Sequence, residues 1–117
     1  MKLEKLKELV VDALEDVKAQ DIQVMDVRGI TDVSDYMIIA SGTSSRQVKA
    51  LAQNVVEESK KQGVIPIGTE GEEKAEWVLV DLGDIIVHVM QSETRDFYQL
   101  EKLWALQEDD ESSEDQA

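Results

Sequence analysis

The chain has no cysteine and only one histidine, which removes several kinds of chemistry. Without thiols there is no disulfide framework, no cysteine nucleophile and no thiolate ligand for a metal ion. A single imidazole cannot build a histidine-rich metal site. The lack of cysteine also fits a reducing compartment, and we expect a cytoplasmic protein.

Long apolar runs and basic residues are scarce as well. No apolar run approaches the ~20 residues that span a bilayer, so a membrane protein is not expected. The 12 Lys and Arg residues face 26 Asp and Glu residues, which gives a net charge of −14. Because nucleic-acid affinity depends on neutralising phosphates, direct DNA or RNA binding is disfavoured. A basic protein partner is favoured, since opposite charges speed encounter.

The length of 117 residues and a hydrophobic content of 42% predict one domain with one core. We expect residues 1–106 to form this domain and residues 107–117 to be an acidic, disordered tail. The first residues lead directly into an amphipathic pattern, so neither a signal peptide nor a transit peptide is expected.

Hydrophobic periodicity predicts the first half of the domain. Helical spacing from Leu3 to Val17 predicts an amphipathic helix. Residues 21–27 alternate and residues 36–40 are almost continuously apolar, which predicts two antiparallel strands, the second buried on both faces. Ser44 and Gln47 have capping-box spacing at the start of a second helix.

The second half is predicted to continue the sheet. Residues 64–67 predict a short strand, parallel to residues 36–40 through a right-handed crossover, and residues 68–75 a polar loop. Ser92 is expected to N-cap a last helix that continues through Trp104. The order is then α-β-β-α-β-β-β-α, an α/β or α+β fold with a mixed five-stranded sheet flanked by helices.

Two β-branched runs around Leu82-Gly83 predict a β-hairpin with a two-residue loop. This register places Trp77 opposite His88 and Asp81 opposite Asp84. One hairpin face is aliphatic and is expected to pack on the core. The other face suits partner binding, since it combines aromatic and apolar side chains with acids. Its members are Trp77, Leu79, Asp81, Asp84, Ile86, His88 and Met90. A helix covering this face, with His88 partly buried beneath it, is the open alternative.

Motifs for catalysis are weak, and we expect no enzyme, cofactor or metal. The Gly-rich turn from Ser41 to Ser45 precedes a helix and has the free amides that bind phosphate, so a nucleotide-handling enzyme is the alternative. The turn lacks the Lys and spacing of a P-loop, and an ordinary helix cap is the favoured explanation. Nucleotidyl transferases also need two acids on the next strand, where residues 64–67 have none. His88 is expected among apolar neighbours that favour neutral imidazole.

A family resemblance rests on six segments, of which the longest runs from Trp77 to Met90. The others are Asp21-Ile22, Ser41 to Arg46, Glu70-Gly71, Arg95 and Tyr98 to Trp104. In these segments the chain resembles the ribosomal silencing factor family, called RsfS, or Iojap after the plant homologue. The resemblance implies a fold related to nucleotidyl transferases but without their catalytic acids.

The resemblance also implies a function. Such a factor binds the large ribosomal subunit through its fourteenth protein on the intersubunit face. It thereby blocks joining of the small subunit and represses translation, with a further link to late assembly of the large subunit. The implied docking surface is the face of Trp77 and His88, with Arg95 and Tyr98 extending it from the last helix. Apart from the resemblance, an exposed apolar patch of this kind leaves self-association of free chains through the same face as an alternative.

Overall fold

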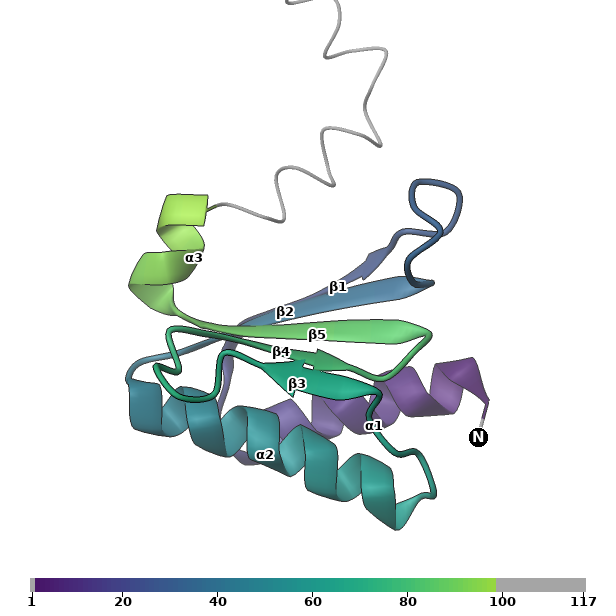
Figure 1. Ribbon diagram of the computed structural model, residues 1–117, viewed down its shortest axis with the longest axis horizontal. Coiled ribbons are helices and arrows are strands. Elements are labelled where there is room, and N and C mark those ends of the chain that lie inside the picture. Colours follow the sequence, from purple (N-terminus) through teal and green to yellow (C-terminus); the bar gives the residue numbers. More distant parts are fainter. Residues whose placement is uncertain (1, 99–117) are drawn as a thin grey trace, which may run out of the picture.

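The computed structural model describes residues 2–98, which form a five-stranded sheet with two helices packed on one face (Figure 1). The elements are α1 Leu3–Asp16, β1 Gln20–Asp26, β2 Tyr36–Gly42, α2 Ser45–Lys61, β3 Gly68–Glu70, β4 Trp77–Asp81, β5 Ile85–Gln91 and α3 Ser92–Tyr98. The strand order is β1-β2-β5-β4-β3, and only β2 and β5 pair in parallel among them. The predicted element order and mixed sheet are confirmed.

The core lies between the sheet and the two long helices. In Figure 1, α1 and α2 both lie beneath the sheet. Their apolar stripes meet the aliphatic hairpin face that the alternation predicts as core. The central members are Val10, Leu14, Val48, Leu51, Val55, Val78, Val80, Val87 and Val89, all with 0% of their area exposed.

Local hydrogen bonds set the two ends of α2. The Ser44 hydroxyl accepts the Gln47 N–H at 3.1 Å, as the capping box predicts. In a capping box the Gln47 side chain would accept the Ser44 N–H. Here its side-chain oxygen accepts the N–H of the preceding residue, Thr43, at 2.7 Å. At the other end Gly63 takes φ +84, the left-handed conformation that closes many helices.

The strand after α2 differs from the prediction. Residues 64–67 form no strand, and β3 lies within the stretch expected to be a loop. The Val64 N–H donates to the Ser59 carbonyl at 2.9 Å, so this part of the chain still completes the helix cap. The Ile67 N–H then joins the sheet by donating to the Asp81 carbonyl at 2.7 Å. β3 runs parallel to β2, as predicted, but it pairs with β4 at the sheet edge.

The hairpin register also differs, by two residues. Trp77 lies opposite Met90 and Leu79 lies opposite His88. The loop residues are Gly83 and Asp84, with Gly83 at φ +94. Because the period of a strand is two, an even shift leaves every side chain on its predicted face. Trp77 and His88 therefore share a face as diagonal neighbours.

The second face of the sheet lies opposite α1 and α2, and we call it the open face. Its members are Met25, Met37, Ile39, Trp77, Leu79, Ile86, His88 and Met90. In Figure 1, α3 rises from one end of this face and the β1–β2 loop, residues 27–35, rises from the other. Ser92 begins α3 as its first helical residue, where the sequence predicted an N-cap. The predicted continuation of the last helix to Trp104 and the tail at 107–117 lie outside the described residues.

Candidate partner-binding face

A hydrogen bond between the tryptophan and the histidine organises the open face. The Trp77 Nε1–H donates to His88 Nδ1 at 2.9 Å, and the ring centroids are 5.8 Å apart. An indole can only donate, so Nδ1 is the lone-pair nitrogen and the neutral imidazole carries its proton on Nε2. The bond holds the indole across β4 and β5, and an aromatic ring held in one orientation loses little entropy on binding.

Burial keeps His88 neutral. Only 6% of its area is exposed, and this burial lowers its pKa from 6.5 to about 4. The result agrees with the expectation of neutral imidazole. His88 Nε2 is buried without a hydrogen-bond partner among residues 2–98. The ring is therefore a support for Trp77, with one donor unused.

The lowered pKa predicts a pH dependence of stability. Unfolding raises the His88 pKa to its ordinary 6.5, so the unfolded chain binds more protons between about pH 6.5 and pH 4. The free energy of unfolding should be undiminished above pH 6.5 and fall by about 2 kcal/mol between pH 7 and pH 5. Urea titrations at each pH measure this loss. His88→Phe should flatten it, and an equal loss in the variant would contradict the assignment.

The open face is unequally exposed. Of its eight members, only Trp77 and Leu79 on β4 are half-buried, as is Asp81 next to them on that strand. The six other members are buried, namely Met25, Met37, Ile39, Ile86, His88 and Met90. The β4 side chains therefore present most of the area that a partner can touch. The buried β5 residues support them from the adjacent strand.

The two carboxylates at the hairpin tip do not face each other as predicted. The Asp81 carboxylate accepts the Gly83 N–H at 2.8 Å and so closes the turn. The Asp84 side chain is exposed beyond it. In the described part of the chain, no group of three or more His, Cys, Asp or Glu residues could hold a metal ion.

Arg95 is a buried connection between elements, with 7% of its area exposed. Its Nη1 donates to the Asp21 carbonyl at 2.6 Å and to the Ser41 hydroxyl at 2.9 Å. It therefore ties α3 to β1 and β2, where the sequence suggested an exposed contact. Tyr98 ends α3, and its side chain lies outside the described residues.

Two amides at the turn from Ser41 to Ser45 and the start of α2 are bonded within the helix cap and are not available to a phosphate. The Thr43 N–H donates to the Gln47 side chain, and the Gln47 N–H donates to the Ser44 hydroxyl.

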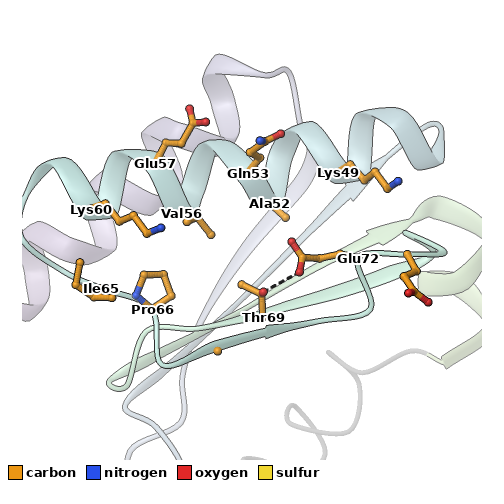
Figure 2. Close-up of a pocket in the computed structure, with 12 residues that line it drawn as sticks. Lys49, Ala52, Gln53, Val56, Glu57, Lys60, Ile65, Pro66, Thr69 and Glu72 are labelled. Carbon is orange, nitrogen blue, oxygen red and sulfur yellow. Dashed lines mark hydrogen bonds between the residues drawn. The ribbon is translucent and has the colours of Figure 1, made fainter.

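A pocket of about 770 Å³ lies elsewhere, between α2 and residues 65–73. Figure 2 shows Ala52 and Val56 above it, Ile65 and Pro66 at one end, and Glu72 bonded to Thr69 at the other.

Comparison with known proteins supports one family. The family model "Ribosomal silencing factor during starvation" matches residues 1–117. The chain belongs to the RsfS family. A protein of Haemophilus influenzae named ribosomal silencing factor RsfS is 51% identical over 100 residues, covering 86% of this chain and 98% of that protein. An RsfS of Chromobacterium violaceum is 47% identical over 104 residues, covering 89% and 85%.

Relatives outside bacteria and solved structures agree with RsfS membership. The mouse "Mitochondrial assembly of ribosomal large subunit protein 1" is 37% identical over 102 residues, which cover 85% of this chain and 45% of that protein. A crystal structure of a Chromobacterium violaceum protein superposes with a TM-score of 0.88 at 47% identity, covering 90% of this chain and 88% of that one. The resemblance read from the sequence is confirmed, and with it the RsfS fold.

The sequence predicts a loop at residues 28–35 but did not mark it as a candidate contact, although one residue in it is unusual for an exposed loop. Val33 is apolar within an otherwise polar stretch, Thr31-Asp32-Val33-Ser34-Asp35. The structure exposes 69% of its area. It also places the loop next to the hairpin tip, since the Asp84 carbonyl accepts the Asp35 N–H at 2.8 Å.

Proposed function

We propose that this chain is a ribosomal silencing factor that binds the large ribosomal subunit and keeps the small subunit from joining. Family membership supports the silencing role, and the name of the mouse relative supports a second role in large-subunit assembly. The observation that carries a binding mechanism is the hydrogen bond by which His88 holds Trp77 on the open face.

The proposed partner on the subunit is its fourteenth protein. Trp77 is the aromatic anchor, with Leu79 beside it and Ile86, His88 and Met90 supporting it. Asp81 and Asp84 meet basic groups of the partner. Arg95 acts by positioning α3, from which Tyr98 extends the surface. A net charge of −14 favours encounter with a basic ribosomal protein.

Silencing by this route is competition for a surface. A factor bound to the large subunit leaves no room for the small subunit. The extent of silencing therefore follows the fraction of large subunits that carry the factor. No cofactor or turnover is required. The cytoplasm is the proposed location, and no helix among the described residues is long and apolar enough to cross a membrane.

Sedimentation with separated ribosomal subunits tests the proposal. The purified chain should travel with the large subunit only, and adding it before the small subunit should reduce the fraction of joined ribosomes. Failure to bind large subunits by a folded chain would overturn the proposal. The nucleotide-handling alternative predicts instead a raised melting temperature with nucleotide.

Self-association of the free chain through the open face stays a second proposal about partners. The half-buried indole of Trp77 is the apolar group that a dimer would cover. A dimer would hide the same surface that the large subunit needs, so the two proposals predict competition between them.

A further inference from the structure

Hydrogen bonds within the β1–β2 loop and to its flanking residues define its conformation. The Ile30 and Thr31 amides both donate to the Val27 carbonyl, at 3.0 and 3.1 Å. The Val33 N–H donates to the Thr31 hydroxyl at 3.1 Å, and the buried Ser34 hydroxyl donates to the Tyr36 carbonyl at 3.2 Å. A loop ordered in this way presents its side chains with little further entropy to lose on binding.

This hydrogen-bonded loop exposes an aliphatic side chain, that of Val33. Val33 has 69% of its area exposed, while Val27 at the base of the same loop is fully buried against Met25 and Met37. The loop thus anchors itself on the open face through one valine and presents the other to solvent. An apolar side chain at the tip of an ordered loop is suited to entering a hollow on a partner.

The loop and the hairpin tip form one end of the molecule. The Asp84 carbonyl accepts the amides of both Asp35 and Tyr36, at 2.8 and 3.1 Å. Val33 lies between the exposed Asp32 and the half-buried Asp35 in the loop sequence. The hairpin tip that the loop contacts adds the exposed Asp84 and the half-buried Asp81. The nearest basic side chain in the loop, Arg28, is already paired with Asp26 at 2.6 Å.

We propose that this end of the sheet, Val33 with its surrounding carboxylates, is a second contact of the docking face. It rests on the proposed function, and its occupant is a basic patch of the large-subunit protein with an apolar hollow that receives Val33. Charge decides between occupants. A second copy that docked at this tip would bring its own acidic residues against these carboxylates, and like charges repel.

Two exposed aliphatic residues allow a matched test. Val33→Ser and Ile65→Ser remove similar side chains, with 69% and 66% of their areas exposed, but Ile65 lines the pocket beside α2. Val33→Ser should weaken binding to purified large subunits by about tenfold. Ile65→Ser should change it less than about twofold, since a residue away from an interface contributes little. Melting temperatures equal to that of the wild-type chain show that folding is unchanged in both variants.

The carboxylates have their own test. Asp32→Asn should slow association with large subunits at low salt by about threefold, and the difference should shrink at high salt. Asp12→Asn is the control, because Asp12 is equally an exposed acid but lies on α1. If the wild-type chain binds large subunits, and Val33→Ser and Ile65→Ser change the affinity equally, then the second contact is overturned but the proposed function is not. No wild-type binding would overturn the proposed function. Weaker self-association in Val33→Ser, with unchanged subunit binding, would assign the tip to a second copy.

Discussion

Trp77→Ala should lower the affinity for the large ribosomal subunit by about 30-fold or more, because truncating a central aromatic anchor costs about 2 kcal/mol or more. The indole is half-buried on β4 and held by His88 at 2.9 Å, so its orientation is set before binding. Sedimentation or interferometry with purified large subunits measures the change. The small subunit should bind neither wild type nor variant.

Two further variants separate the contributions of Trp77. Trp77→Phe keeps an aromatic ring but loses the N–H that donates to His88. Its affinity for the large subunit should therefore lie between those of wild type and Trp77→Ala. Ile65→Ala removes an exposed side chain beside α2 and should bind as wild type does. Circular dichroism must show that Trp77→Ala is folded at the assay temperature. A folded Trp77→Ala chain with wild-type affinity would exclude this ring as the anchor.

The faces of the sheet were predictable even where the register was not. The predicted hairpin placed Trp77 opposite His88, and the structure places it opposite Met90. The turn closes one residue later because Asp81 accepts the Gly83 N–H, which sets Gly83 and Asp84 as the loop. Alternation has a period of two, so it fixes the composition of a face but cannot distinguish registers that differ by two residues.

The role of Arg95 was not predictable from local patterns. Its guanidinium reaches the Asp21 carbonyl, 74 positions away in the sequence, where β1 is irregular. Asp21 takes φ +49 there, a conformation that no motif in the sequence announces. The family resemblance implied Arg95 as an extension of the docking surface, and only the packing of α3 shows that its side chain is buried.

Gly71→Ala should be the most destabilising small substitution in the loop before β4. Gly71 takes φ +86, and a Cβ built there would collide with the carbonyl oxygen of Trp77. Left-handed backbone costs a residue with a side chain about 1–2 kcal/mol, and relieving the collision requires the start of β4 to shift. We expect the free energy of unfolding to fall by about 3 kcal/mol or more, with a melting temperature lower by about 10 °C or more.

Gly63→Ala isolates the conformational part of this effect. Gly63 has φ +84, almost the same as Gly71, but nothing lies within 4 Å of its added Cβ. It should therefore lose only about 1 kcal/mol in a urea titration. Similar losses in the two variants would show that the contact with Trp77 is relieved without cost. A larger loss in Gly71→Ala would show that the glycine keeps the backbone of Trp77 in place. The same close approach would then fix both the stability of β4 and the position of the proposed anchor.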